Sequence, residues 1–425
     1  MVDIAIVRDN PELLRAGMRS KRNGDPAVVD QLITVDERRR ESVTREQQLQ
    51  ADANVAAKAI GELMKSGRRD DAQAQIKASA GLKEDLKIQG EETARLDAEL
   101  RRLMLEIPNP PHSSVPEGAG PDDNGVPFET ATLPTFDFEP RPHWELVETL
   151  GLVDFDRGAK VTGAGFPFYL GKGARLQRAL IQFFLDSADL AGYTEVQPPI
   201  MVNTASATGT GQLPDKEAQM YEAPRDELYM VPTAEVPLTN YRREEILAES
   251  DLPVRYAGYT PCFRREAGSY GKDVRGLNRL HQFDKVEIVQ LVRPETSYET
   301  LTAMCNHAES LLNALGLPYR RLLLCTGEMG FTQTKTFDLE VWSAGQARWL
   351  EVSSVSAFEA FQARRMNIRY RPADGGKPRF VHTLNGSALA LPRMMASLIE
   401  LYQQADGSIA VPEVLQKYTG FDRIG

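Results

Sequence analysis

Two stretches near the N-terminus carry a heptad pattern that restricts the fold more than any other feature. The first runs from about Ala27 to Met64, is rich in Ala, Glu, Arg and Gln, and contains no proline. The sequence SGRRD (66–70) interrupts the pattern, and the second stretch continues to about Glu106. Two helices of similar length joined by a short turn predict an antiparallel coiled-coil hairpin that is roughly 50 Å long. The expected seam positions are Leu32, Val35, Arg39, Ser42, Glu46, Leu49, Ala53, Ala56, Ile60 and Leu63, then Leu82, Leu86, Gln89, Thr93, Leu96, Leu100, Leu103 and Ile107.

This hairpin has two interpretations. Its periodicity alone favours a dimerisation coiled coil. Polar residues in the seam, namely Arg39, Glu46 and Thr93, weaken a role in packing only. Basic residues that are candidates for phosphate contacts are the arginines at 38–40, 68 and 69, Lys65 and Lys77. Each of these, taken singly, is more simply a solvated surface charge.

A segment dense in Pro, Gly, Ser and Asp, IPNPPHSSVPEGAGPDDNGVP (107–127), follows the helical region. Such a composition predicts a linker at a domain boundary. From about Phe128 onward, strand and helix patterns are mixed as far as the C-terminus, which predicts one α+β domain. We therefore expect a helical arm at 1–110, a linker at 111–127 and an α+β domain at 128–425.

Composition narrows the functional class. No apolar run is long enough to span a bilayer, and the N-terminus shows no secretory signal, so we expect a cytoplasmic protein. Three distant cysteines and five scattered histidines have no metal-ligand spacing, which indicates unpaired thiols and argues against a zinc site. The net charge of −10 argues against a general nucleic-acid coat protein. Residues 1–110 hold 19 basic and 20 acidic side chains, so this region repels a polyanion less than the remainder does.

The stretch FRREAGSYGKDVRGLNRLHQFDKVE (263–287) has the pattern of two strands joined by a long glycine-containing loop. Residues two apart on a strand share a face, which places Arg264 with Glu266, and Phe283 with Glu287 on the partner strand. A guanidinium suits phosphate oxygens, an aromatic ring stacks on a purine, and a carboxylate accepts from an amine. Charge alternation by itself, however, usually marks a solvated surface hairpin.

The exact string is more specific than its charge pattern. It closely resembles the second signature motif of class II aminoacyl-tRNA synthetases, in the form carried by seryl-tRNA synthetases. The resemblance implies that Arg264 binds both the α-phosphate of ATP and the serine carboxylate, and that Glu287 binds serine. The residues that it implies at ATP are Arg264, Arg265, Glu266, Leu280 and Phe283, with Phe283 stacked on adenine.

The segment VPTAEVPLT (231–239) has a strand-like pattern with Thr233 and Glu235 on one face. Read alone, it indicates a capping threonine and an exposed glutamate. In seryl-tRNA synthetases TAE is the amino-acid-binding signature, which implies that Thr233, the Ala234 backbone and Glu235 surround the serine. The segment TGTGQLPDKEAQMY (208–221) resembles a mobile loop of the same family, and its glycines suit closure over a substrate.

The stretch KTFDLEVW is followed by RWLEVSSVS, in which Glu351, Val352, Ser353 and Ser354 match the family's ATP-binding tetrapeptide. A carboxylate and a hydroxyl are hard oxygen ligands, so the resemblance implies Mg²⁺ at Glu351 and Ser354. These two positions are three residues apart, so on a regular strand their side chains would point to opposite faces, and joint binding of the metal requires an irregular strand or a strand end. Without the resemblance the stretch indicates only a plain β-strand.

The segment TLNGSALALPRMMASLIELYQ (383–403) begins as a strand and continues as a helix. Its GSA turn and Arg393 resemble the third class II motif. The resemblance implies that Arg393 holds the γ-phosphate end of ATP and that Asn385 and Ser387 face the amino acid. The chain departs from the commoner family pattern at Ala357, Ala388 and Pro392.

The resemblance covers the arm, the linker and all three class motifs. It implies a serine–tRNA ligase in which Arg264 and Arg393 are catalytic, with L-serine, ATP, Mg²⁺ and tRNA(Ser) as its ligands, and tRNA(Sec) where present. The first motif, a helix before Gly192 and a strand with Pro198 and Pro199, implies a homodimer interface. The tandem prolines alone indicate only a strand terminus.

Two other functions stay open. A paralogue that activates an amino acid for another carrier would lack the long arm, so residues 27–107 argue against it. A coiled-coil interaction protein with an inactive body would not need the intact set Arg264, Glu287, Glu351 and Arg393. In seryl-tRNA synthetases, tRNA is recognised largely through its long variable arm, which suits a protruding helical hairpin.

Overall fold

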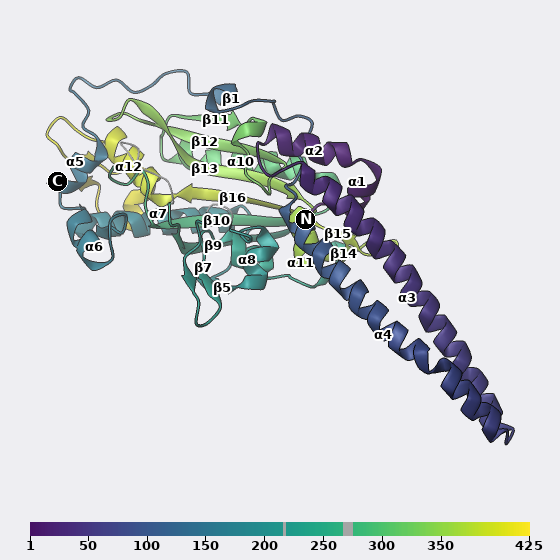
Figure 1. Cartoon of the computed structure of the whole chain (residues 1–425). Helices are drawn as coiled ribbons and strands as arrows, with labels where there is room; N and C mark the ends of the chain where they lie inside the picture. The colour runs from purple at the N-terminus through teal and green to yellow at the C-terminus, as the bar shows by residue number, and fades with distance from the viewer. Residues whose placement is uncertain (216–217, 267–274) are drawn as a thin grey trace. The chain divides into compact units, whose positions relative to one another are not determined.

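The computed structural model describes residues 1–215, 218–266 and 275–425. They form two compact units (Figure 1). The helical unit comprises Val2–Arg19 and Asn23–Pro108, and the sheet unit comprises Met1, Ser20–Arg22 and Asn109–Gly425. Within the described ranges, no helix is both long and apolar enough to cross a lipid bilayer.

The helical unit contains the predicted antiparallel hairpin. Helices α3 (Ala27–Lys65) and α4 (Arg69–Glu106) pack against each other, and the turn between them falls within the predicted SGRRD sequence. Two short helices, α1 (Ile4–Asp9) and α2 (Pro11–Ser20), precede them. Every residue assigned to the heptad seam is buried or half-buried, which confirms the predicted pairing of the two long helices.

Polar residues in the seam bond to one another. The Ser42 and Thr93 hydroxyl oxygens lie 2.9 Å apart, and Gln89 Nε2 donates to Ser42 Oγ at 2.7 Å. A buried polar group costs free energy unless it is hydrogen-bonded, so the hairpin register that aligns these three residues is favoured over its alternatives. The polar seam positions thus specify the register of the two helices.

The sheet unit is built on an eight-stranded sheet in the order β1-β11-β12-β13-β16-β10-β9-β4. All neighbouring pairs are antiparallel except β4 and β9, which confirms an α+β fold. Strands β9 and β10 form the predicted hairpin, and Gly268 and Gly271 of its loop lie outside the described residues. The strands are β1 (Gly125–Glu129), β4 (Thr194–Glu195), β9 (Val254–Phe263), β10 (Gln282–Val292), β11 (Tyr319–Leu323), β12 (Lys335–Ser343), β13 (Arg348–Glu359) and β16 (His382–Ala390).

The two faces of this sheet differ in polarity. Apolar residues of one face form the main core with helices α7 (Gly171–Leu190), α10 (Ser297–Ala314) and α12 (Leu391–Leu401). Alternate residues of the same strands point to the other face and carry hydroxyl, amide and charged groups. The short helices on that polar side are α8 (Thr204–Thr210), α9 (Glu235–Asn240) and α11 (Phe361–Met366).

Smaller elements complete the sheet unit. Strands β5, β6 and β7 form one small sheet, and β8, β14 and β15 form another. Residues 125–127 of the expected linker are the start of β1. Besides short 3-10 turns, the other α-helices and strands of the described residues are α5 (His143–Thr149), β2 (Val153–Asp154), α6 (Phe155–Val161), β3 (Phe168–Tyr169), β5 (Met201–Asn203), β6 (Glu222–Ala223), β7 (Leu228–Met230), β8 (Ile246–Ala248), β14 (Arg369–Arg371), β15 (Arg379–Phe380), β17 (Ile409–Ala410), α13 (Glu413–Thr419) and β18 (Arg423–Ile424).

Asp36 is a buried carboxylate of the helical unit. Its side chain is 2% exposed and accepts hydrogen bonds from Arg8 at 2.7 and 2.8 Å and from Arg40 at 3.1 Å. The Arg8 hydrogen bond lowers the pKa of Asp36. Because the folded-state pKa is lowered, the ionised carboxylate stabilises the fold above its unfolded pKa, and this stabilisation is lost as pH falls through the folded value.

We therefore expect Asp36→Asn to lower the opening free energy of nearby α3 amides by about 2 kcal/mol at neutral pH, because hydrogen bonds to a charged group are lost. Hydrogen exchange measures this opening, and the difference from wild type should shrink as pH falls through the carboxyl range. Asp52→Asn, at an exposed position of the same helix, is the control. Equal effects of the two variants would contradict the assigned role of Asp36.

Candidate active site

The polar face of the sheet gathers side chains from five adjacent strands. The register places Glu287 opposite Ser387, and Asp338 opposite Ser354. Most of these polar residues are buried, as in a binding site rather than a solvated surface. They are Thr260 of β9, Lys285 and Glu287 of β10, Asn385 and Ser387 of β16, Glu351, Ser354 and Ser356 of β13, and Thr336, Asp338 and Glu340 of β12.

The hairpin of β9 and β10 agrees with the prediction in β10 and differs from it at the end of β9. Phe283 and Glu287 lie four residues apart on β10, so they share a face as predicted. Strand β9 ends at Phe263, so the prediction that Arg264 and Glu266 share a strand face is wrong. Glu266 has a φ of 49°, in the left-handed region, which is incompatible with an extended strand.

Lys285 lies between Phe283 and Glu287 and was not among the predicted site residues. Its Nζ lies 2.5 Å from Glu287 Oε2 and donates to Thr233 Oγ1 at 2.8 Å. Lys285 is 6% exposed and Glu287 is 2% exposed, so the pair is withdrawn from solvent. The period-two pattern of FDKVE is the sequence signal that places all three side chains on one face.

Glu235 brings a second carboxylate to the same pocket. Its Oε1 accepts from Gln362 Nε2 at 2.6 Å. Burial, and then the negative charge of Glu287, raise the pKa of Glu235 to about 7, while Gln362, Lys285 and Asn385 oppose that rise. When both carboxylates are ionised, the two carboxylates and one ammonium leave the pocket one positive charge short of neutrality.

The prediction that Thr233 and Glu235 share a strand face is wrong. Residues 231–234 form no strand, and Glu235 begins helix α9. Pro237 is compatible with this helix because residues of the first turn need no backbone donor. Thr233 Oγ1 nevertheless accepts from the Glu235 backbone N–H at 3.3 Å, and the Ala234 side chain packs into the core.

Gln362 of α11 orients Glu235 and was also not predicted. It is fully buried, donates to the Thr210 carbonyl at 3.1 Å as well as to Glu235, and accepts from Thr383 Oγ1 at 2.6 Å. Its partners come from three segments that are distant in the sequence. No local pattern around FQARRM could therefore have identified it.

Glu351 and Ser354 lie on the same face because β13 is irregular. The register of β13 against β12 shifts by one residue at this point. Val352 and Val355 both enter the main core, although residues three apart on a regular strand point to opposite faces. The bulge therefore turns Glu351 and Ser354 together toward the polar side, as joint binding requires.

Asp338 of β12 adds a second carboxylate beside Glu351 and was not predicted. Burial, and then the charge of Glu351, raise the pKa of Asp338, while a hydrogen bond with Ser354 opposes the rise. Asp338 Oδ1 is buried and has no hydrogen-bond partner among the described residues. An orphaned carboxylate oxygen beside a second carboxylate fits a hard cation. In the part of the chain that the structure describes, no three His, Cys, Asp or Glu side chains converge as a preformed metal site.

Arg393, in the first turn of α12, reaches back to β13. Its Nε donates to the Asn278 carbonyl and its Nη1 to the Glu351 carbonyl, both at 2.9 Å. Arg393 Nη1 also lies 3.5 Å from Glu351 Oε2. Two departures from the family pattern lie nearby: Pro392 is in the first turn of α12, where proline is tolerated, and Ala388 packs into the core.

Arg264 lies against the ring of Phe283. Its Cζ is 5.2 Å from the ring centroid, and its Nε donates to the Pro232 carbonyl at 3.3 Å. The cation–π contact holds the guanidinium beside the aromatic face. Glu266 forms an ion pair with Arg279. The cation–π contact thus brings together two predicted ATP-site residues, Arg264 and Phe283.

The remaining predicted ATP-site residues differ in exposure. Arg265 is exposed. Leu280 and Val352 are buried in the main core, so their side chains serve packing, and only their backbone groups remain for a ligand. Ser353 donates to the Ser387 carbonyl at 2.7 Å, which ties β13 to β16.

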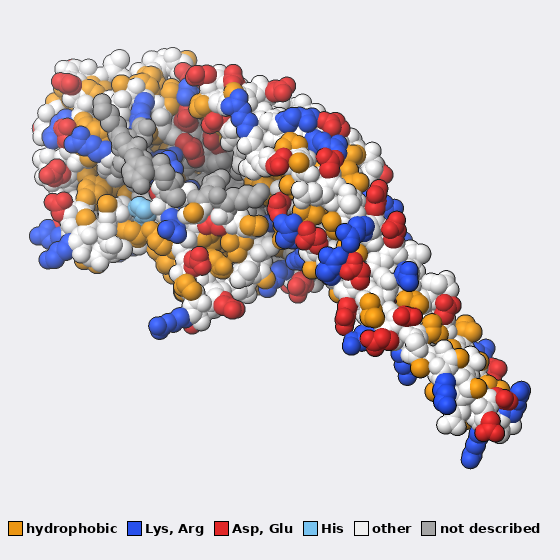
Figure 2. Space-filling view, in the orientation of Figure 1, with side chains coloured by type: hydrophobic (Ala, Val, Ile, Leu, Met, Phe, Trp, Pro, Cys, Tyr) orange, Lys and Arg blue, Asp and Glu red, His pale blue; other side chains and the backbone are white. Residues whose placement is uncertain are grey.

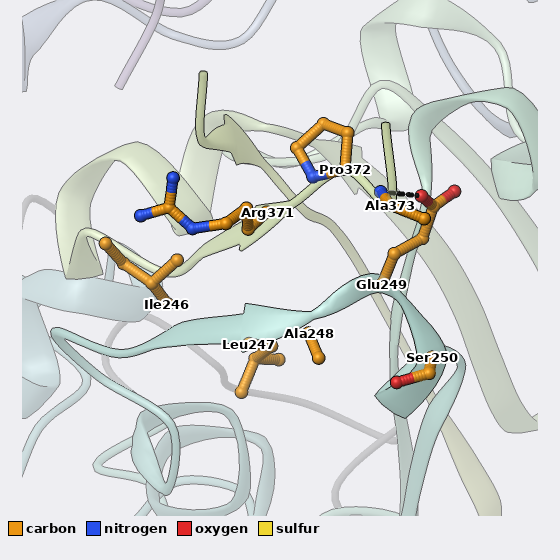
Figure 3. A pocket seen from close by; sticks show the side chains of 8 residues that line it. All are labelled: Ile246, Leu247, Ala248, Glu249, Ser250, Arg371, Pro372 and Ala373. Atoms are coloured by element: carbon orange, nitrogen blue, oxygen red, sulfur yellow. Dashed lines mark hydrogen bonds between the residues drawn. The ribbon is translucent and has the colours of Figure 1, made fainter. Parts of the chain in front are cut away.

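A separate pocket of about 400 Å³ lies beside strands β8 and β14 (Figure 3). Glu249 accepts there from the Ala373 backbone N–H at 2.7 Å. No predicted site residue lines this pocket, so we place the active site on the polar face of the large sheet. The lining residues are Ile246, Leu247, Ala248, Glu249, Ser250, Arg371, Pro372 and Ala373.

Comparison with known proteins gives a consistent result over the whole chain. Residues 1–111 match the model of the seryl-tRNA synthetase N-terminal domain, and residues 220–402 match that of the class II tRNA synthetase core domain (G, H, P, S and T). A serine–tRNA ligase of Salinibacter ruber is 58% identical, over 100% of this chain and 99% of the relative. One of Prosthecochloris aestuarii is 50% identical over 100% and 99%.

Solved structures agree. Seryl-tRNA synthetase from Pyrococcus horikoshii, complexed with ATP, is 35% identical with a TM-score of 0.92, covering 100% of this chain and 99% of that one. The cytoplasmic serine–tRNA ligase of Naegleria fowleri, in complex with AMP, is 27% identical with a TM-score of 0.86 and covers 100% and 98%. The resemblance inferred from the motifs is thus confirmed, and the chain belongs to the seryl-tRNA synthetase family of class II aminoacyl-tRNA synthetases.

Proposed function

We propose that this protein is a serine–tRNA ligase. It activates L-serine with ATP to seryl-adenylate and transfers the serine to the 3′ end of tRNA(Ser), and of tRNA(Sec) where that tRNA is present. The observation that carries the proposal is the pocket of Glu235, Glu287 and Lys285 beside Arg264 and Phe283. Family membership and relatives named serine–tRNA ligase support it.

A serine zwitterion matches this pocket in charge and in hydrogen bonding. Its ammonium supplies the missing positive charge between Glu235 and Glu287, and its carboxylate pairs with the Arg264 guanidinium. Alanine would leave the pocket's hydroxyl partners unpaired, which makes it a poor substrate. The side chains available to the serine hydroxyl are those of Thr233, Glu287, Asn385 and Ser387.

ATP lies along the polar face from β10 toward β13. Adenine stacks on Phe283, and Glu266 together with backbone groups near Leu280 reads its edge. Arg264 then meets the α-phosphate, and Arg393 meets the γ-phosphate end. Arg264 contacts the ring of Phe283 on β10, whereas Arg393 bonds to the Glu351 carbonyl of β13, and these contacts on different strands support the order.

Glu351, Ser354 and Asp338 would hold Mg²⁺, because Mg²⁺ takes one or two carboxylates and completes its shell with water and substrate phosphates. The bound ion neutralises charge on the triphosphate. Of these residues, Asp338 carries the orphaned oxygen. Arg393, held 3.5 Å from the Glu351 carboxylate, adds a fixed positive charge at the same end.

The chain's contribution to activation is positioning and charge stabilisation. The serine carboxylate oxygen attacks the α-phosphorus in line, and the bond to the bridging oxygen of pyrophosphate breaks. Arg264 holds the nucleophile and the α-phosphate together. Arg393 stabilises the charge that develops on the departing pyrophosphate. No side chain is assigned as a general base for the later transfer to the tRNA ribose.

The helical hairpin is the proposed binding surface for tRNA. Basic and acidic side chains are interspersed along its visible face (Figure 2). Four predicted arginines are already in ion pairs, namely Arg38 with Glu92, Arg39 with Asp97, Arg40 with Asp36, and Arg68 with Asp71. The stronger candidates for phosphate contacts are exposed and have no ion-pair partner among the described residues: Lys65, Arg69 and Lys77.

We also propose that the protein is a cytoplasmic homodimer, as the first class II motif implies. Helix α7 and strand β4 are the elements that correspond to this motif. The prediction that the strand carries Pro198 and Pro199 is wrong, because β4 ends at Glu195 and both prolines lie between β4 and β5. Leu190 at the end of α7 is 88% exposed, and Ile200 in the same motif is 40% exposed, which suits an interface between two copies.

The assay that tests the function is serine-dependent ATP–pyrophosphate exchange followed by charging of tRNA(Ser). The proposal requires both activities. Exchange without charging would indicate a paralogue that serves another carrier. Absence of both would indicate an inactive body carrying a coiled coil.

Removal of the pocket carboxylate tests amino-acid recognition. Glu287→Ala should reduce serine activation on the order of 100-fold or more, because the ammonium and the hydroxyl of serine lose a buried partner. The control is Asp284→Asn, a carboxylate on the opposite face of the same strand that bonds to Tyr259 and Gln177. It should affect stability and leave the KM for serine within a few-fold. Near-normal activation by Glu287→Ala would remove Glu287 from the pocket.

Replacement of the two arginines tests the phosphate clamps. Arg264→Ala and Arg393→Ala should each slow adenylate formation by about 10²- to 10³-fold, the loss expected for one preorganised donor. Lysine at either position should rescue only partly, since it cannot donate bidentately. Single-turnover adenylate formation measures the step, and Arg293→Ala, at an exposed pair with Glu249, is the control. Full rescue by lysine would show that a point charge suffices.

Removal of the arm separates the two half-reactions. Replacing residues 30–103 with a short turn should leave pyrophosphate exchange almost intact and abolish tRNA charging, because the polar face of the sheet lies in the other unit.

In the full chain, Ala at Lys65, Arg69 and Lys77 should weaken tRNA binding and flatten its salt dependence more than Arg68→Ala does. Normal charging by the armless protein would refute the RNA-binding role.

A further inference from the structure

A buried histidine–carboxylate pair lies in the sheet unit and takes no part in the proposed reaction. His143 of α5 and Glu400 of α12 are both fully buried. His143 Nδ1 lies 2.7 Å from Glu400 Oε1, and the His143 backbone N–H donates to the same oxygen at 2.9 Å. A buried ionisable pair is costly unless further hydrogen bonds satisfy both groups, so the other contacts of His143 and Glu400 are informative.

The second ring nitrogen of His143 fixes the tautomer. The Leu277 backbone N–H donates to His143 Nε2 at 2.9 Å. A backbone N–H can only donate, so Nε2 is an acceptor and the ring proton resides on Nδ1, where it is donated to Glu400. His143 therefore connects a carboxylate on one side with the backbone of Leu277 on the other.

Glu400 is itself held in place. Its Oε2 accepts from the Ser343 hydroxyl and, at 3.0 Å, from the Gly345 backbone N–H. Serine, histidine and glutamate here do not form a hydrolytic triad. Ser343 bonds to the carboxylate rather than to the ring, and the Nε2 that would act as a base is occupied by Leu277.

The segment that His143 holds leads directly to the active site. The residue after Leu277 is Asn278, whose carbonyl accepts from Arg393 Nε at 2.9 Å. Gly276 packs so closely on the histidine that a Cβ added to it would lie 2.3 Å from His143 Nε2. Its φ of +67° also favours glycine. The backbone of 276–278 is thus seated on His143 and carries the acceptor that orients Arg393.

We infer that His143, oriented by Glu400, is a positioning residue that fixes the Leu277–Asn278 backbone and thereby the direction of the Arg393 guanidinium toward ATP. The inference rests on the proposed role of Arg393. Arg393 and Glu400 both belong to α12, so the helix that carries the arginine also carries the group that orients its support. Disturbance of His143 should impair the use of ATP more than the recognition of serine.

Two substitutions divide the functions of the ring. His143→Asn places an amide near the position of Nδ1, so it keeps a donor for Glu400 and loses the acceptor for Leu277. His143→Gln places an amide oxygen near the position of Nε2, so it keeps that acceptor and loses the donor. In pyrophosphate exchange, we expect His143→Asn to raise the KM for ATP about tenfold or more, because misplacement of a binding group is costly. The KM for serine should stay within twofold of the wild-type value. For His143→Gln, which keeps the acceptor for Leu277, we expect a KM for ATP much closer to that of wild type.

Gly276→Ala provides a second route, because its methyl group would push the backbone off the ring; it should give the same ATP-selective defect even if His143→Asn does not fold. Equal rises in both KM values, or a larger ATP defect in His143→Gln than in His143→Asn, would overturn the inference.

Wild type and Arg393→Ala are run beside these variants. If those two do not differ in their use of ATP, the proposed role of Arg393 fails, and the inference fails with it. If they differ and His143→Asn does not, only the inference fails.

Discussion

The arrangement on which the rest of the site depends is a pair of buried carboxylates, Glu235 and Glu287, of which only Glu287 is paired with a lysine. Lys285 contacts Glu287 at 2.5 Å, and Glu235 remains partly unneutralised, with its pKa raised to about 7. Such a pocket is costly when it is empty, because burial penalises the charged form of Glu235. A ligand that brings one positive charge and hydrogen-bonding groups removes that cost, and the amino end of serine is such a ligand.

The sheet makes this arrangement possible by keeping its two faces chemically separate. Strand alternation puts Val286 and Ile288 in the main core and Lys285 and Glu287 on the polar face. The same separation is maintained in β13 only because a bulge changes the parity near Val352. Helices α7, α10 and α12 cover the apolar face, and the polar face lines the site beside the short helices α8, α9 and α11.

Features set by local pattern could be read from the sequence. The heptad positions gave the pairing of the helical hairpin, and the period-two pattern placed Phe283 with Glu287. Contacts between distant segments could not be read in this way. Gln362, Asp338 and the pair of His143 and Glu400 acquire their roles from partners that lie far away in the chain. The TAE segment was misassigned as a strand because its apolar residues alternate there, while tertiary packing places Glu235 at the start of a short helix.

Proton release on serine binding tests the central claim most directly. Isothermal titration calorimetry of L-serine into the protein, at several pH values and in buffers of different ionisation enthalpy, counts the protons released or taken up on binding. If the ammonium of serine pairs with Glu235, the carboxyl group must ionise, so binding should release up to about one proton below pH 7 and progressively less above it. Glu235→Gln should abolish the release. No proton release across this range, or the same release in Glu235→Gln, would contradict the account.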